Sequence, residues 1–264
     1  MPSTTEKMIA KKEDGIGWMI FNNPARLNAV SFDMWQAVPA ILDDFAADDE
    51  VRVVVVTGAG GKAFVSGADI SEFEEKRGSK EAVETYNAAG TAAHLALSRM
   101  MKPTIAMIRG YCIGGGMAVA LDCDLRVAAE GSRFGVPAAK LGLGYAYDGI
   151  ARLAGLVGPA MAKEIFFTAR QFSGEEALAM GLVNRLVPAT VLDGYVRDYA
   201  RTIGANAPLT IGAVKMAVTE YLKDPDTRDL DAVQAAVDAC FASEDYVEGR
   251  TAFMEKRPPQ FKGR

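Results

Sequence analysis

The sequence predicts an α/β protein with a mainly parallel sheet, helices packed outside it, and a helical C-terminal region. Short β-branched runs such as residues 51–57 alternate with longer stretches whose apolar residues recur at helical spacing. From Ile150 onward the chain becomes almost wholly helical. Its 264 residues suffice for one large domain, or for a domain with a small appendage.

The first expected elements are a hairpin and a helix. Residues 8–12 and 16–21 are typical of two strands of a hairpin on either side of Asp14-Gly15, a favoured two-residue turn. Ser31 can cap the following helix, which should continue to about residue 47. Pro39 falls inside this helix and should kink or interrupt it.

Buried strands and helices then alternate. The β-branched run at residues 51–57 is typical of a strand buried on both faces. The next expected elements are a helix over residues 81–100, a strand over 104–108, a short helix from about Gly115, and a strand over 125–129.

The C-terminal part has its own signals. Residues 173–176 (SGEE) form a capping box, and a short strand is expected over 183–187. Helices are expected at about 192–205, 209–222, 229–242 and 246–257. We therefore divide the chain into a core over residues 1–190 and a helical region over 191–264.

Two glycine segments that follow strand-like runs suggest a pair of backbone donors. They are residues 65–70 (VSGADI) and 110–116 (GYCIGGG). Glycine lets the backbone approach a bound group closely, and an N–H at a helix start has no intrahelical partner. Two such donors directed at one carbonyl oxygen would stabilise an enolate or a tetrahedral oxyanion.

Motifs along nearly the whole chain resemble the crotonase superfamily (enoyl-CoA hydratase/isomerase family). They are KAFVSGADI at 62–70, KPTIA at 102–106, FGVP at 134–137, GLVN at 181–184 and EGRTAFMEKR at 248–257. The resemblance implies a crotonase-like spiral of ββα units, with the C-terminal helices forming a trimer interface. It also implies an acyl-CoA thioester as substrate, with no separate cofactor.

The resemblance further implies where the ligand binds. The N–H groups of Ala68 and Gly115 would hold the thioester oxygen. The CoA contacts implied are Arg26 and Leu27 in one loop; Ser66, Ala68, Asp69 and Ile70 in the turn beside it; and Phe253 and Lys256, which in hydratases reach CoA from a neighbouring subunit. Solvated charges are the alternative interpretation of Arg26 and Lys256, and bracing of the loop is the alternative for Asp69.

The departures from the family pattern bear directly on the chemistry. The two catalytic glutamates of a typical hydratase correspond to Ala118 and Ala138. Alanine cannot transfer a proton, whereas hydration needs an activated water and a proton donor. The binding half of the site is therefore present, and both usual acid/base groups are missing.

A second, partial resemblance offers other polar groups. Residues 141–145 (LGLGY), with Gly149-Ile150, 162–169 (AKEIFFTA) and 243–246 (SEDY), are similar to methylmalonyl-CoA decarboxylase, which has a pocket tyrosine at the position of Tyr145. Tyr145 either acts in the acyl pocket or merely packs. Asp148 is either a base or a helix cap.

Bulk properties exclude several classes of function. A net charge of −5 argues against non-specific nucleic-acid binding. No apolar run is long enough for a membrane span and no signal peptide is visible, so we expect a cytoplasmic protein. The three cysteines form no metal-ligand pattern, and the single histidine, His94, is expected at an ordinary helix position. Asp122 and Asp124 are expected to be turn residues.

These observations favour an acyl-CoA enzyme whose reaction passes through a thioester enolate. Decarboxylation is favoured because it needs the fewest acid/base side chains. Hydration or isomerisation with Asp148 or Tyr145 is the alternative. A CoA-binding protein with little catalysis is an alternative of another class. A nicotinamide-dependent oxidoreductase is disfavoured because the glycine fingerprint after residue 57 is incomplete. The expected assembly is a homotrimer or a dimer of trimers.

Overall fold

The computed structural model describes residues 5–69 and 80–264. The expected hairpin is present: β1 (Met8–Glu13) pairs antiparallel with β2 (Ile16–Phe21) across the Asp14-Gly15 turn. Both turn residues have positive φ, 54° and 76°, as this tight turn requires.

The larger sheet has six strands in the order β1-β2-β3-β5-β7-β10. From β2 onward it is parallel, through β3 (Val53–Gly58), β5 (Thr104–Ile108), β7 (Leu125–Ala129) and β10 (Arg185–Val187). Val54 and Val56 face one hydrophobic core, whereas Val53 and Val55 face a second. The sheet is thus buried on both faces, which explains the continuous valine run.

A smaller sheet lies beside it, in the order β4-β6-β8-β9. Its strands are β4 (Ala63–Val65), β6 (Tyr111–Ile113), β8 (Arg133–Gly135) and β9 (Phe172–Ser173). The chain repeatedly adds a strand to the large sheet, a strand to the small sheet, and then a helix. This is the predicted spiral of ββα units.

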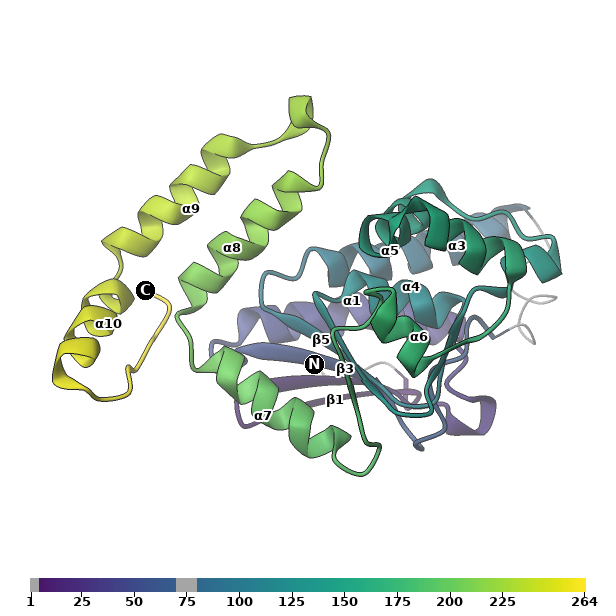
Figure 1. Cartoon of the computed structure of the whole chain (residues 1–264), viewed down its shortest axis with the longest axis horizontal. Coiled ribbons are helices and arrows are strands. Elements are labelled where there is room, and N and C mark those ends of the chain that lie inside the picture. Colours follow the sequence, from purple (N-terminus) through teal and green to yellow (C-terminus); the bar gives the residue numbers. More distant parts are fainter. Residues whose placement is uncertain (1–4, 70–79) are drawn as a thin grey trace.

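Helices cover both faces of the large sheet (Figure 1). On one side are α1 (Phe32–Ala47), α3 (Lys80–Ser98) and α4 (Gly115–Asp122). On the other is α7 (Leu192–Gly204), whose Leu192, Val196 and Ala200 join the second core. Of the two effects expected of Pro39, a kink or an interruption, the interruption is wrong, because α1 continues through Pro39 as one helix.

Two further segments of the core bear on the site. The 3₁₀ helix η3 (Pro137–Leu141) follows β8 and leads into α5 (Tyr147–Thr168). Within α5, Gly158 has non-helical φ and ψ of 78° and 160°, so the helix consists of two segments. The predicted capping box at Ser173 and Glu176 is confirmed at the start of α6 (Gly174–Ala179).

The last helices, α8 (Pro208–Tyr221), α9 (Leu230–Ala242) and α10 (Glu244–Glu255), extend away from the sheets (Figure 1). An ion pair of 2.7 Å between Lys215 on α8 and Asp124 joins this part to the core, and Asp124 also accepts hydrogen bonds from Thr104. Across the described residues no helix is both long and apolar enough to cross a bilayer.

Candidate active site

The first site loop follows β4. Gly67 has a φ of 115°, a conformation that favours glycine, and its carbonyl accepts a 2.8 Å hydrogen bond from the Val30 N–H. The Asp69 N–H donates to the Val30 carbonyl at 2.9 Å. These two bonds hold the backbone on either side of Ala68, which is half-buried.

The second site loop joins β6 to α4. Gly114 has a φ of 55°, and its N–H donates to the Gly135 carbonyl at 2.9 Å. A methyl group on Gly116 would lie 2.0 Å from the Val65 carbonyl oxygen, so only glycine lets α4 approach β4 this closely. Gly115 is consequently the first residue of a helix seated directly on the other loop.

The two loops bring the predicted donors together. A methyl group on Gly115 would lie 3.7 Å from the Ala68 nitrogen. In the part of the chain that the structure describes, no acceptor binds the N–H of Ala68 or of Gly115. The Gly115 N–H also lies at the positive end of the α4 dipole. This geometry suits two donors to a single oxygen.

No carboxylate occupies the two positions at which hydratases carry glutamates. Ala118 lies in α4, one turn after Gly115, and is half-buried. Ala138 lies in η3 and is 5% exposed. Neither side chain can transfer a proton, so any acid/base group of this site comes from elsewhere.

Tyr145 lies between η3 and α5 and is half-buried. Its ring packs edge-on against Phe166 at 4.9 Å between centroids, and Gly149 leaves room for it, since a methyl group there would be 2.8 Å from the ring. Burial raises the pKa of the Tyr145 phenol. No described residue forms a hydrogen bond with its hydroxyl. The phenol is therefore protonated at neutral pH and available as a donor.

Asp148 is less favourably placed. It is exposed in the first turn of α5, and the N-cap position is occupied by Ala146, without a side-chain cap. Of the two alternatives for Asp148, a base or a helix cap, the cap is therefore wrong. An acidic residue in the first turn still interacts favourably with the helix dipole.

The residues predicted to meet CoA near Ala68 form one surface. Leu27 follows the 3₁₀ helix η1 (Pro24–Arg26), and its carbonyl accepts a 3.2 Å hydrogen bond from the Ser66 N–H. The Arg26 guanidinium lies 3.3 Å from the carboxylate of Asp69, which is 7% exposed. Ile70 lies outside the described residues.

Phe253 and Lys256 lie elsewhere. Both are exposed at the end of α10, in the helical extension that lies away from the two sheets (Figure 1). One chain alone does not bring them to the loop of Ala68.

The structure also identifies a positioning residue that sequence reasoning missed. Asn28 is fully buried with a φ of 56°, and its side-chain amide donates to the carbonyls of Ala59 and Ala63. Its side-chain oxygen accepts from the Asn23 N–H. Asn28 thereby fixes the loop of Leu27 against β4. An asparagine just after a proline-containing turn was the only signal in the sequence.

A second missed feature is a partly buried cluster of a histidine, an aspartate and an arginine: His94, Asp122 and Arg152. The His94 Nδ1 lies 2.5 Å from Asp122 Oδ2, and Arg152 contacts the other carboxylate oxygen. The prediction that Asp122 is a turn residue is wrong, since it ends α4 and its side chain is 2% exposed. Its partners come from α3 and α5, so no local pattern could reveal the cluster.

The described residues contain no group of three or more His, Cys, Asp or Glu side chains able to hold a metal ion. All three cysteines are free thiols. Burial raises the pKa of Cys112, and it raises that of Cys123 to about 12. Both buried thiols are protonated and unreactive at neutral pH.

Comparison with known proteins identifies the family of the chain. Residues 11–264 match the family model described as enoyl-CoA hydratase/isomerase. The chain is 36% identical to a short-chain-enoyl-CoA hydratase of Clostridium acetobutylicum, over 95% of each chain. It is also 36% identical to a crotonyl-CoA hydratase of Syntrophomonas wolfei, over 97% of this chain and 98% of that one.

Among solved structures, an enoyl-CoA hydratase/carnithine racemase from Magnetospirillum magneticum superposes with a TM-score of 0.91 at 35% identity, covering 99% of this chain and 97% of that one. Fold, motifs and sequence identity thus agree. The chain belongs to the enoyl-CoA hydratase/isomerase family and has the crotonase fold.

Proposed function

We propose that this enzyme removes CO2 from an α-carboxylated acyl-CoA thioester, such as a malonyl or methylmalonyl thioester. One observation carries the proposal: the N–H groups of Ala68 and Gly115 lie side by side and unpaired, whereas the neighbouring Ala118 and Ala138 offer no carboxylate. Such a site can stabilise an enolate and has no glutamate to deprotonate a carbon or activate a water.

In this reaction the departure of the substrate's own carboxylate as CO2 generates the enolate, so no protein base is needed. The bond between the α-carbon and its carboxylate breaks, CO2 leaves, and the electron pair moves onto the thioester oxygen as an enolate. The two N–H groups stabilise that oxyanion, at about 3 kcal/mol or more per donor. The α-carbon then takes a proton and the thioester carbonyl reforms.

Tyr145 is the proton donor we assign to this step. Its pKa is raised by burial, so the phenol keeps its proton until the strongly basic enolate forms. The phenolate left behind recovers a proton from water. Asp148, which is exposed in the first turn of α5, has no part in the proton transfer; its charge interacts favourably with the helix dipole.

Hydration of a 2-enoyl thioester is the second candidate. Two relatives at 36% identity are named as hydratases, of short-chain enoyl-CoA and of crotonyl-CoA. With alanine at both glutamate positions this reaction needs a base from another part of the site.

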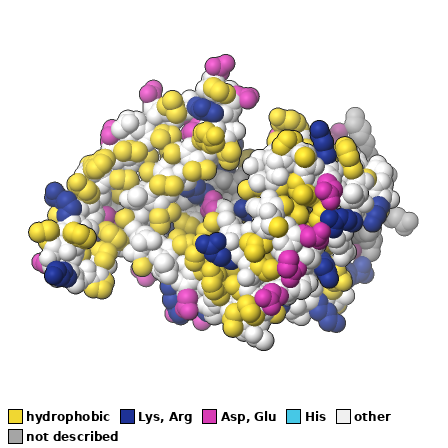
Figure 2. Space-filling model, viewed as in Figure 1, with side chains coloured by type: hydrophobic (Ala, Val, Ile, Leu, Met, Phe, Trp, Pro, Cys, Tyr) yellow, Lys and Arg dark blue, Asp and Glu magenta, His cyan; other side chains and the backbone are white. Residues whose placement is uncertain are grey.

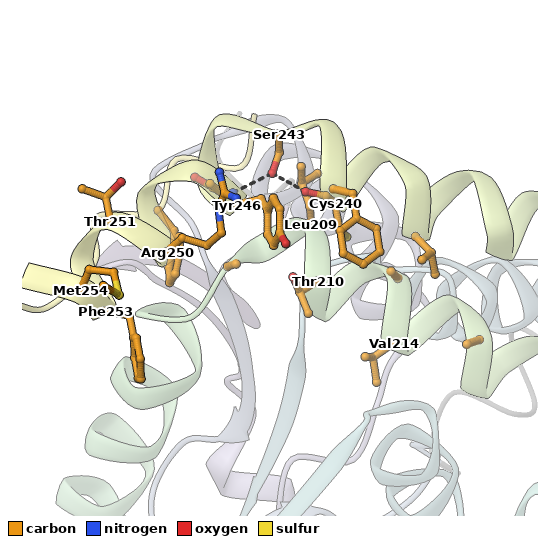
Figure 3. A pocket seen from close by; sticks show the side chains of 18 of the residues that line it. Leu209, Thr210, Val214, Cys240, Ser243, Tyr246, Arg250, Thr251, Phe253 and Met254 are labelled. Carbon is orange, nitrogen blue, oxygen red and sulfur yellow. Dashed lines mark hydrogen bonds between the residues drawn. The ribbon is translucent and has the colours of Figure 1, made fainter. Parts of the chain in front are cut away.

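We further propose that the active form is a homotrimer or a dimer of trimers. Apolar side chains cluster on the exposed surface of the C-terminal helices (Figure 2), among them Val214, Val218, Phe241, Phe253 and Met254. A groove of about 1130 Å³ lies between α8, α9 and α10 (Figure 3), away from the loops of Ala68 and Gly115. Apolar surface of this extent is typical of a subunit interface.

Assembly would also complete the CoA site. Lys256 ends α10 in the left-handed conformation, with a φ of 56°, and Phe253 is 82% exposed one turn earlier. A neighbouring subunit would place these two residues beside the surface formed by Arg26, Leu27 and Ser66.

The test is a turnover screen of the purified protein with malonyl-, methylmalonyl- and crotonyl-CoA, following CO2 release, acyl-CoA product and loss of the enoyl absorbance. We expect CO2 release from at least one α-carboxylated thioester. Tight binding of all three thioesters without turnover would instead indicate a CoA-binding protein, and hydration alone would favour the second candidate.

A further inference from the structure

Arg126, in β7, is a buried arginine that the proposed reaction does not use. The residue is 4% exposed, and its guanidinium donates hydrogen bonds to four backbone carbonyls. They are those of Leu182 at 2.8 Å, Ala120 at 3.2 Å, Cys123 at 2.7 Å and Asp124 at 3.4 Å. Burial lowers the pKa of Arg126, but a guanidinium stays protonated in proteins.

The other charges near Arg126 are paired. Asp122 contacts Arg152, and Asp124 forms a 2.7 Å ion pair with Lys215. No carboxylate of the described residues forms an ion pair with Arg126 itself. Burying a charge is unfavourable unless other groups compensate it, so a buried cation held by neutral carbonyls requires an explanation.

The carbonyls that Arg126 binds include the C-terminal end of α4. Ala120 lies in the last turn of this helix, and Cys123 is its C-cap. Carbonyls at this end of a helix lack intrahelical partners and form the negative end of the helix dipole. The guanidinium therefore satisfies them and puts a positive charge at one end of α4. Gly115, the predicted oxyanion donor, is the first residue at the other end.

The GLVN segment at residues 181–184 fixes Arg126 in this place. The Asn184 side-chain oxygen accepts a 2.8 Å hydrogen bond from the Arg126 N–H, and the Asn184 N–H donates to the Arg126 carbonyl at 2.9 Å. The Leu182 carbonyl accepts from the guanidinium Nε. This segment thus holds both the backbone and the side chain of Arg126, which gives the sequence motif a physical role.

The charge of Arg126 also acts on the strand that leads into the second site loop. Burial raises the pKa of the Cys112 thiol, and the positive charge of Arg126 opposes that rise. Cys112 lies in β6, two residues before Gly114. The eight residues of α4 span about 12 Å at 1.5 Å per residue. At that distance and an effective dielectric constant of about 20, a unit charge changes the stability of an oxyanion about tenfold.

We propose that Arg126 is a positioning residue of the oxyanion hole, which anchors the C-terminal end of α4 and adds its charge to the positive potential at the Gly115 N–H. The negative charge that compensates Arg126 is the one that forms on the thioester oxygen during the reaction. A charge that is in place before the reaction lowers the barrier without reorganisation. The inference rests on the proposed oxyanion hole, and it applies to any reaction in which the thioester oxygen becomes negative.

The experiment separates the charge of Arg126 from its anchoring role. Arg126→Lys keeps the charge, Arg126→Met removes the charge and the hydrogen bonds, and Arg126→Gln removes the charge but keeps two N–H donors. Arg201→Met is the matched control, because Arg201 is an exposed arginine of α7 on the opposite face of the large sheet. The measurements are the decarboxylation kcat, the affinity for free CoA, and the C=O stretch of bound butyryl-CoA labelled with ¹³C at the thioester carbonyl.

We expect Arg126→Met and Arg126→Gln to lower kcat about tenfold and to reduce the red-shift of the bound carbonyl, with unchanged affinity for CoA. Arg201→Met should match the wild type. An anchoring role alone would lower the melting temperature and leave the carbonyl stretch of the bound thioester unchanged. A folded Arg126→Met or Arg126→Gln variant with the kcat and the stretch of the wild type would overturn the inference.

Arg126→Lys supplies the same comparison within one folded protein. Burial lowers the pKa of a lysine, so its ammonium should lose its proton between about pH 6 and about pH 9, which ¹³C NMR of the lysine side chain follows. The titratable groups that face this position are Asp124, Cys112 and Cys123, and they are the same in the wild type. We expect kcat, as a ratio to the wild type, to fall as that ammonium is lost. A ratio and a stretch that ignore this titration would overturn the inference, even where neither neutral variant folds.

The carbonyl stretch also distinguishes this inference from the proposed reaction. A red-shift that depends on Arg126 in an enzyme that releases no CO2 would refute only the decarboxylation. Decarboxylation with a red-shift that does not depend on Arg126 would refute only the role of Arg126. No red-shift in the wild type would refute the oxyanion hole, and with it this inference.

Discussion

Replacing Gly115 by proline tests the oxyanion hole with little cost to the fold. Gly115 is the first residue of α4, a position that proline tolerates because its missing N–H would have no intrahelical partner. The substitution deletes the donor and puts the proline ring where the N–H points. Gly115→Ala is the matched control, since its methyl group meets nothing closer than 3.7 Å and the N–H stays in place.

The expected magnitude follows from the role of the donor. Loss of one oxyanion-hole donor costs about 3–4 kcal/mol, or 10²–10³-fold in kcat. Gly115→Pro should therefore lose at least 10²-fold in decarboxylation kcat, while Gly115→Ala stays within about threefold of the wild type. Circular dichroism and the melting temperature establish that both variants are folded. Calorimetry with free CoA measures whether each variant still binds CoA with the affinity of the wild type. A folded Gly115→Pro variant with wild-type kcat would refute the assignment.

Four further outcomes are expected. Tyr145→Phe should lower the decarboxylation kcat by about 10²-fold and leave CoA affinity unchanged, and an unaffected kcat would show that the ring only packs. Ala118→Glu combined with Ala138→Glu should raise crotonyl-CoA hydration at least tenfold, whereas fast wild-type hydration would contradict the role of the missing glutamates. Burial lowers the pKa of His94 from 6.5 to about 4, so the unfolded chain takes up this proton first as the pH falls. The free energy of unfolding of the wild type should therefore drop between pH 6.5 and 4 by about 3 kcal/mol more than that of His94→Gln, as measured by urea titration. Sedimentation should give about three or six times the 28.2 kDa chain mass, and a monomer at micromolar concentration would contradict the assembly.

Local sequence signals predicted most of the fold. The valine run of β3, the Asp14-Gly15 hairpin and the capping box at Ser173 each determine their own element, because hydrophobic period, turn chemistry and end capping act within a few residues. Pro39 does not end α1, because the packing of the deeply buried apolar face of this helix outweighs one weakened turn. The packing of α7 onto the large sheet, within the range assigned to the C-terminal region, depends on tertiary contacts that periodicity does not report.

In the candidate site, too, the features set by local sequence could be predicted and those set by tertiary contacts could not. The two glycine loops could be predicted because close backbone approach demands glycine, as the 2.0 Å contact at Gly116 illustrates. The pairing of His94, Asp122 and Arg152 could not, because its members come from three helices and each alone has an ordinary explanation. Asn28 escaped notice for the same reason, since its partners at Ala59 and Ala63 are distant in sequence.

The central claim is that the Ala68 and Gly115 N–H groups together hold the thioester oxygen. Difference infrared spectroscopy of butyryl-CoA labelled with ¹³C at the thioester carbonyl measures this directly, because two hydrogen bonds weaken and red-shift the C=O stretch. We predict a clear red-shift on binding to the wild type and to Gly115→Ala, and a smaller shift in Gly115→Pro. A bound thioester whose carbonyl stretch matches that in water, or is the same in all three proteins, would contradict the account.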